Sequence, residues 1–179
     1  ESKFSFVNNK ILQENLAMKM QHIIFLFSVE KSYELPGAIQ YSVLQTMIVF
    51  TASIVEGLIH YKLAELIESN KVQEHQIMGK EEKFSNLKEL YKISDSEKIL
   101  GVKQVIKSKA LSDDTNFFEL NKAAKRSGLF TEELFQHAEK IRQTRNRMHP
   151  YSLKEVDDKY SKEDINNIFA MAAKIIERI

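Results

Sequence analysis

The chain has 179 residues and a formal net charge of +1, so it carries no overall basic field to recruit nucleic acid, and any such role needs a local patch. Its hydrophobic content of 43% is ordinary for a globular domain, and its 5 glycines and 2 prolines are too few for a fold rich in strands and turns. The absence of cysteine excludes disulfides, thiolate metal sites and a cysteine nucleophile, and it fits a reducing cytoplasm. We therefore expect long helices.

The first part of the chain predicts two helices. The first runs from about residue 9 to 33, where apolar residues recur at helical spacing, and Pro36 with Gly37 ends it. The second runs from about 39 to 69 and is apolar on nearly every side, as expected of a helix surrounded by others. Residues 35–55 carry no charge, but their polar side chains would be costly in lipid. We expect a buried central helix and no membrane span.

The middle of the chain is less regular. The segment EEKFSNLKELYKI, residues 81–93, has apolar residues at roughly helical spacing and predicts a weak amphipathic helix. In residues 94–113 the apolar positions are interrupted by Gly101 and mixed with lysines. A helix, irregular turns and a lysine-rich loop are all open interpretations of that segment.

Three capping signals divide the last third into helices. An Asp–Thr pair at 114–115 can cap a helix that ends near Gly128. Thr131 caps the next helix, which Pro150 stops because the residue before proline avoids the helical region. The final helix begins at Ser161. Together these elements predict an all-α fold, an up-and-down helical bundle of five to six helices.

The helix before Pro150 ends in the polar segment IRQTRNRMHP, residues 141–150. At roughly 100° per residue, the angles measured from Leu134 place four of its polar side chains between the apolar stripe and its margin. Arg145 lies near the middle of that stripe, whereas Arg147 points to the opposite side, where we expect it to be solvated. The four residues of this polar sector are Arg142, Arg145, Asn146 and His149.

A guanidinium close to a core needs a partner, because an isolated buried charge is very unfavourable. The internal candidate is Glu56, the only acid in the apolar part of the central helix. An ion pair between Glu56 and Arg145 or its neighbours would lock two helices together, and His60, one turn along, can join it. A bound phosphate is the alternative partner of the guanidinium, and a third possibility is that the carboxylate and the phosphate bind it in turn.

The segment IRQTRNRMHP, preceded by NKAAKRSGLFTEELFQHAEK and followed by a short loop and a closing helix, resembles the HEPN superfamily. The signature of that superfamily is an arginine and a histidine separated by four to six residues, and Arg142 and His149 are separated by six. ASIVEGLIHYKLAELI also resembles the helix that precedes the signature helix in such bundles. The likeness begins at about residue 38, so we expect one helical domain over 1–179, with an N-terminal helix and turn over 1–37 and a HEPN-like bundle over 38–179. The start at Glu1 favours a trimmed chain or a piece of a longer protein.

The resemblance implies RNA cleavage of a toxin or defence type, without metal or cofactor, by a cytoplasmic homodimer. Two signature helices would face each other and form one composite site. His149 would exchange a proton with the ribose 2′-hydroxyl or the leaving oxygen, and Arg142 would stabilise the charge that develops on phosphorus. Arg145 would assist, and Asn146 would orient a phosphate oxygen.

The likeness also implies an alternative, because many members of the superfamily are non-catalytic modules for dimerisation or for binding nucleic acid or nucleotides. Active members usually have Asn, Asp or His directly after the first arginine, whereas Gln143 follows Arg142. If Arg145 is taken as the signature arginine, the required polar residue, Asn146, follows it directly. However, only three residues then separate it from His149, fewer than the four to six of the signature. Further basic residues form either a solvated face or an RNA-binding rim around the signature helix: Lys122, Lys125, Arg126 and Lys140.

Overall fold

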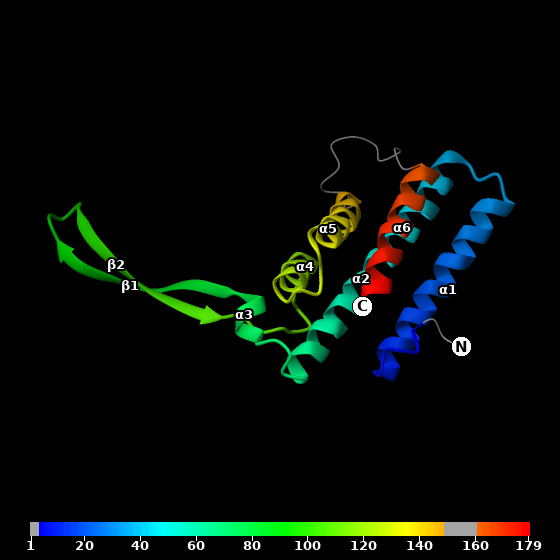
Figure 1. Cartoon of the computed structure of the whole chain (residues 1–179). Helices are drawn as coiled ribbons and strands as arrows, with labels where there is room; N and C mark the ends of the chain where they lie inside the picture. Colours follow the sequence, from blue (N-terminus) through cyan, green and yellow to red (C-terminus); the bar gives the residue numbers. More distant parts are fainter. Residues whose placement is uncertain (1–3, 149–160) are drawn as a thin grey trace.

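The computed structural model describes residues 4–148 and 161–179, with side chains except those of 81–87 and 102–105. Within these ranges the chain is an all-α helical bundle from which one long two-stranded hairpin projects (Figure 1). The elements, in chain order, are α1 (Lys10–Ser32), α2 (Gly37–Glu68), α3 (Glu74–Met78), β1 (Lys80–Lys92), β2 (Lys98–Ser108), α4 (Phe117–Arg126), α5 (Glu132–Arg147) and α6 (Lys162–Arg178).

The centre of the bundle is α2, which contacts α1, α4, α5 and α6. It buries residues along most of its length, including Ala52, Val55 and Ile59, as expected of a helix that is apolar all round. The predicted central helix is therefore confirmed. Among the described residues, α2 is also the one helix that is long and apolar enough to cross a membrane, and half of its most apolar window is buried inside the bundle.

The core has two parts, and α2 and α6 contribute to both. The first part also includes residues of α3, α4 and α5, and the second also includes α1 and the N-terminal residues Phe4 and Val7. Within α1, Leu16 and Ile23 are the buried apolar residues, whereas Ile24 remains 58% exposed. The apolar spacing of α1 thus predicted the helix correctly, but much of its apolar surface is not covered by the bundle.

Side-chain caps fix where the last two helices begin. The Thr131 hydroxyl accepts a hydrogen bond from the Leu134 N–H at the start of α5. Ser161 and Asp164 form a reciprocal capping box at the start of α6. Both starts agree with the predictions from sequence. Gly128, with φ +75°, follows the end of α4, as the predicted C-terminal cap requires.

The predicted cap of α4 was wrong by one residue. Asn116, not the 114–115 pair, accepts a hydrogen bond from the Glu119 N–H. The Thr115 hydroxyl instead accepts from the Ser112 N–H in the loop before the helix. Asn and Thr have similar capping ability, so sequence alone did not distinguish the neighbouring positions.

The prediction of a helix over residues 81–93 was also wrong, and none of the interpretations of 94–113 included a strand. The two segments form an antiparallel ladder that runs from the Lys80–Ser108 pair to the Lys92–Lys98 pair, with two register shifts. The turn closes through a hydrogen bond from the Ile93 N–H to the Glu97 carbonyl. Valine and isoleucine in the second segment favour a strand, and each segment satisfies the backbone of the other.

Candidate functional site

The last two turns of α5 carry three of the four residues of the predicted polar sector. The helix is anchored there by Ala138 and Ile141, which are completely buried. Arg142 and Arg145 are half-buried, and Asn146 is exposed. His149 lies outside the described residues, as does Pro150, and α5 itself ends at Arg147. The part of the site that the structure describes is therefore built on one helix end.

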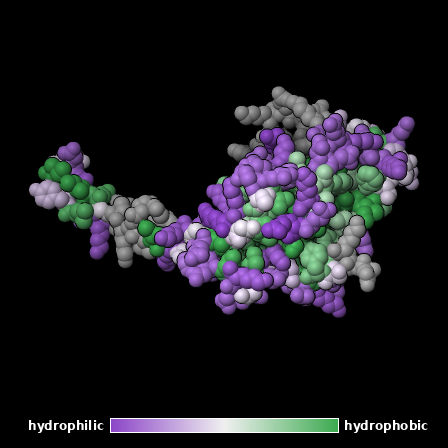
Figure 2. Space-filling view, viewed as in Figure 1, coloured by the Kyte–Doolittle hydropathy of each residue, from purple (hydrophilic) through white to green (hydrophobic). Residues whose placement is uncertain are grey.

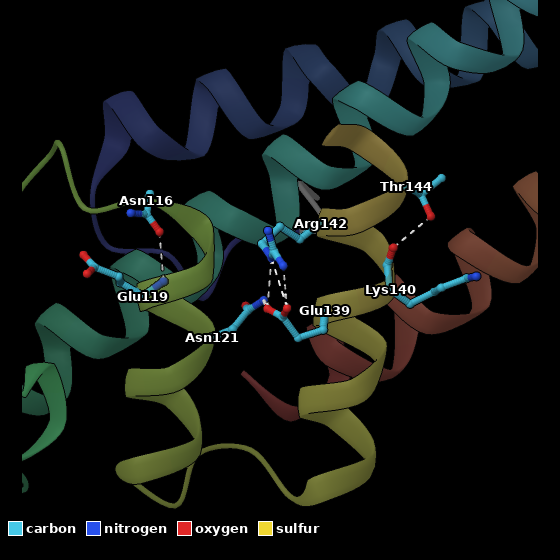
Figure 3. Close-up of polar contacts among 7 residues, drawn as sticks. All are labelled: Asn116, Glu119, Asn121, Glu139, Lys140, Arg142 and Thr144. Carbon is cyan, nitrogen blue, oxygen red and sulfur yellow. Dashed lines mark hydrogen bonds and ion pairs between the residues drawn. The ribbon is translucent and has the colours of Figure 1, made fainter. Parts of the chain in front are cut away.

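Arg142 is held by a buried carboxylate that the sequence reasoning missed. Its Nε donates to both oxygens of Glu139 at 3.1 Å, and its Nη2 donates to Glu139 Oε2 at 2.7 Å. Asn121 of α4 donates from Nδ2 to Glu139 Oε1 at 2.7 Å. Figure 3 shows the three side chains pointing toward one another between α4 and α5. We call this group the Glu139 network.

Burial makes the Glu139 network a strong constraint on Arg142. Asn121 is completely buried and Glu139 is 7% exposed, so little water reaches the carboxylate. The ion pair and the hydrogen bonds together satisfy a charge that would otherwise be costly to bury. The Asn121 Oδ1 is buried with no hydrogen-bond partner among the described residues. The network therefore fixes the direction of the guanidinium.

One edge of the Arg142 guanidinium binds Glu139, and the other edge has no partner in the part of the chain that the structure describes. A guanidinium has five N–H donors arranged as two forks, and Glu139 occupies the fork made by Nε and Nη2. No described residue accepts from Nη1. Phe118 lies beneath the group, with its ring centroid 4.8 Å from Cζ, and Lys122 places its Nζ 3.9 Å from the same centroid. Two cations thus gather around one half-exposed ring.

The ion pair predicted for Glu56 is present, and it joins α2 to α5. Arg145 Nη2 lies 3.5 Å from Glu56 Oε2. The Arg145 and Glu56 side chains are 37% and 25% exposed, and the Arg142 side chain is 19% exposed. The pair of Arg145 with Glu56 is therefore longer and more accessible to solvent than the pair of Arg142 with Glu139. The helical angles predicted the opposite order of burial for the two arginines. His60 does not join the pair, because its Nε2 lies 3.1 Å from the Ser112 carbonyl.

The polar side chains at the end of α5 differ in their contacts and exposure. Arg142 and Asn146 are one turn apart, but the guanidinium turns back toward Glu139 three residues earlier. Asn146 is exposed, and Arg147 is exposed as predicted. The structure therefore brings Arg142 and Arg145 to the same end of the helix, each beside a carboxylate, and leaves Asn146 at the surface.

The four residues proposed for a basic rim do not form one continuous surface. Lys125 pairs with Glu132 at 2.5 Å and lies over the Phe135 ring. Arg126 donates to the Ile77 carbonyl at 3.0 Å, at the base of the hairpin. Lys122 lies beside Arg142 through their shared contact with Phe118.

Lys140 is exposed on the side of α5 that faces the start of α6. The pKa of Asp164 is lowered mainly by hydrogen bonds from the Ser161 backbone and hydroxyl, and the charge of Lys140 adds to this effect. Figure 3 draws the Lys140 side chain extending away from the Glu139 network. Lys122 is therefore the one rim residue that shares a contact with an arginine of the site.

One sequence signal could have revealed Glu139. It lies three residues before Arg142, the spacing at which opposite charges meet on a helix. Asn121 gave no such signal, because only the packing of α4 against α5 brings its amide to the carboxylate.

The described geometry can bind an oxyanion through preoriented guanidinium groups at one helix end. Comparisons of the chain with protein-family models, with curated proteins and with solved structures find no match. The inference of function therefore depends on these residues and on the resemblance of their sequence pattern.

Proposed function

We propose that this chain is a HEPN-like domain that cleaves RNA without a metal ion, as a homodimer of the toxin or defence type. The observation that supports the proposal most is the geometry of Arg142. A buried carboxylate holds one fork of its guanidinium, and the other fork, which has no partner among the described residues, would bind a phosphate. Arg145 and Asn146 lie within the next turn, and His149 follows them in the sequence.

The proposed reaction is attack of the ribose 2′-oxygen on the adjacent phosphorus. The new 2′-O–P bond forms as the 5′-O–P bond breaks, so the products are a 2′,3′-cyclic phosphate and a 5′-hydroxyl. His149 takes the proton of the 2′-hydroxyl or gives one to the departing 5′-oxygen, since imidazole exchanges protons near neutrality. Arg142 and Arg145 stabilise the negative charge on the phosphoryl oxygens, and Asn146 orients one of them.

The homodimer is the second part of the proposal. One α5 terminus supplies few groups for both proton transfers and charge stabilisation, so a second copy completes the site across a two-fold axis. The carboxylates Glu139 and Glu56 reduce the repulsion between two arginine-bearing faces. A phosphate between the faces reduces it further.

The test is incubation of the purified full chain with RNA in EDTA, beside His149→Ala and Arg142→Lys variants. Lysine keeps the positive charge near Glu139 but lacks the second fork, so this variant should fold and lose cleavage. The matched controls are His75→Ala and Arg147→Ala, which remove an exposed histidine of α3 and an exposed arginine of α5. We expect the controls to cleave like the wild type. Equal behaviour of all five proteins rejects the catalytic proposal.

The non-catalytic alternative is favoured by a different observation. Arg142 and Arg145 already have carboxylate partners, which lowers the net positive charge of the surface. A module of that kind would bind RNA or nucleotides weakly and leave them intact. Fluorescence anisotropy with labelled RNA distinguishes the catalytic proposal from the non-catalytic alternative. RNA binding that weakens as salt is added, with no cleavage in the same sample, supports the alternative.

A further inference from the structure

The far end of the hairpin carries an exposed apolar cluster, here called the hairpin tip. Leu90 and Tyr91 are 68% and 65% exposed, and Ile99, which pairs with Tyr91 in the ladder, is 49% exposed. Leu90 covers Gly101 so closely that a Cβ there would lie 2.6 Å from Leu90 Cδ1. Ile93 adds a further exposed apolar side chain at the turn. Figure 2 shows the apolar colour at this end of the hairpin.

The charges of the hairpin tip do not select a charged partner. Residues 88–101 contain three lysines and three acids, so their formal net charge is zero. Four of the six charges pair within the hairpin, as Lys98 with Glu89 at 2.7 Å and Lys92 with Asp95 at 2.5 Å. The chemistry of the tip therefore fits an apolar surface and not a phosphate backbone.

Among the described residues, the hairpin is joined to the bundle near its base, where the Lys109 N–H donates to the Gly79 carbonyl and Arg126 reaches the Ile77 carbonyl. Its tip lies far from the helices (Figure 1). A lone two-stranded hairpin is marginally stable in water, and its outer strand edges are open to pairing. The apolar tip of this hairpin is thus left uncovered by the described residues of the bundle.

The same chain has an apolar recess on the opposite side of the bundle. Both α1 and α6 pack on α2, and the space between them has a volume of about 430 Å³. Apolar side chains from all three helices line it, and we call this space the α1/α6 recess. Representative lining residues are Ile24 and Phe27 from α1, Ile54 from α2, and Phe169 and Ile176 from α6.

The α1/α6 recess and the hairpin tip cannot meet within one chain, because the hairpin projects from the side of the bundle remote from α1 (Figure 1). Their sizes agree. A protein cavity of roughly 150 Å³ holds one benzene-sized group, so about 430 Å³ holds two or three apolar side chains such as those of the tip. Both surfaces are apolar. The tip has no net charge, so its insertion would not bury an excess of one sign of charge.

We propose that the hairpin tip of one copy of this chain inserts into the α1/α6 recess of a second copy. Two such contacts related by a two-fold axis form a closed dimer, with each hairpin covered by its partner. This contact uses neither α5 nor its arginines. It is therefore independent of the proposed RNA cleavage.

The absence of cysteine in the chain makes a cross-linking test clean. Ser94→Cys labels the turn of the hairpin tip, and Ala173→Cys labels the α1/α6 recess. When the two single-cysteine proteins are mixed and mildly oxidised, we expect the mixed disulfide to form faster than either self-disulfide. Gln76→Cys, an exposed position in α3 near the hairpin base, is the control. Predominant tip-to-tip disulfide, or a rate no higher than that of the control, overturns the proposal.

Sedimentation of substituted proteins gives a second readout. The double variant Leu90→Ser, Ile99→Ser alters only exposed side chains of the tip, and Phe27→Ser alters the recess. Each should weaken self-association on the order of tenfold or more, because apolar contact area is lost. Ile39→Ser, an exposed apolar residue of α2, should leave association unchanged. Tip and recess variants that sediment like the wild type would overturn this inference, whereas a loss of association with Asn146→Glu, an exposed position of the polar sector on α5, reports on the α5 dimer of the proposed function.

Discussion

At the scale of single residues, the two arginines of the site differ in how firmly the protein holds them. Arg142 lies against a carboxylate that is almost completely buried, whereas Arg145 reaches a partly exposed one at 3.5 Å. Desolvation strengthens the first pair and also makes it costly to break. Water screens the second pair. We therefore expect removal of Arg142 to lower the free energy of unfolding more than removal of Arg145, so Arg145 is the arginine that can be altered with less effect on the fold.

Glu139→Gln should destabilise the bundle by about 2 kcal/mol, because it removes the counter-charge of Arg142 and weakens the bonds in a buried network. Urea unfolding followed by circular dichroism measures this difference. Glu177→Gln, an exposed position on α6, should change stability by less than about 0.5 kcal/mol. Equal effects of the two substitutions would show that the Glu139 network does not support the fold.

Arg142→Ala should cost more than Arg145→Ala. Removal of Arg142 leaves the Glu139 carboxylate buried without its cation, at a cost of about 3 kcal/mol. Removal of Arg145 breaks a half-exposed pair worth at most about 1 kcal/mol. The same unfolding experiment ranks them, and the reverse order would contradict the burial that the structure assigns to these side chains.

How far the sequence predicted the site also differs from residue to residue. Glu56 was identified as the internal partner because it is the lone acid on an apolar helix, and the structure pairs it with Arg145. Asn121 could not be identified, because its role depends on the angle at which α4 packs against α5. The order of burial of the two arginines was wrong for the same reason: helical angles describe one helix, and burial depends on its neighbours.

At the scale of elements, the start of α6 makes a prediction about pH. Hydrogen bonds from the Ser161 backbone and hydroxyl lower the pKa of Asp164 from its ordinary value of 3.8. A carboxyl whose pKa is lower in the folded state contributes stability that is fully present above the unfolded value and is lost as pH falls through the folded value.

Asp164→Asn keeps the shape of the cap but removes its charge, so the wild type should be the more stable protein at pH 6. The difference between the two proteins should shrink as the pH falls below about 4. Urea unfolding across pH 3 to 6 measures this. Glu163→Gln, one residue earlier and outside the capping box, is the matched control. A difference that stays constant across this range would contradict the role of the Asp164 carboxylate.

The hairpin is the element that the sequence predicted least well. Its first segment has apolar residues at spacings that also suit a helix, and no Asn–Gly or Asp–Gly turn separates its two strands. Strand pairing is non-local, so the periodicity of one segment does not reveal it.

Because the described contacts between the hairpin and the bundle lie near the base of the hairpin, the bundle should fold without it. We expect a chain in which a short Gly-Ser linker replaces residues 81–107 to keep its helical circular dichroism and one cooperative unfolding transition. Lys80 and Ser108 are paired across the base, so a short linker can join them. Loss of cooperative unfolding would mean that the hairpin is part of the core. The same protein should not form the dimer inferred from the hairpin tip.

At the scale of the whole molecule, the all-α bundle around α2 was predictable, because an apolar helix flanked by amphipathic ones has few other arrangements. The exposed apolar surface of α1 and the α1/α6 recess were not predictable. They depend on how α1 and α6 are spaced on α2, and the sequence of each helix specifies only its own apolar positions.

The proposed function requires that the end of α5 support attack of a ribose hydroxyl on phosphorus without a metal ion. The most direct measurement compares an RNA oligonucleotide with its 2′-deoxy counterpart of the same sequence, each incubated with the full chain in EDTA, with mass analysis of the ends. We expect cleavage of the ribose strand to 2′,3′-cyclic phosphate and 5′-hydroxyl ends, while the deoxy strand stays intact. Cleavage of both strands, or of neither, would contradict it.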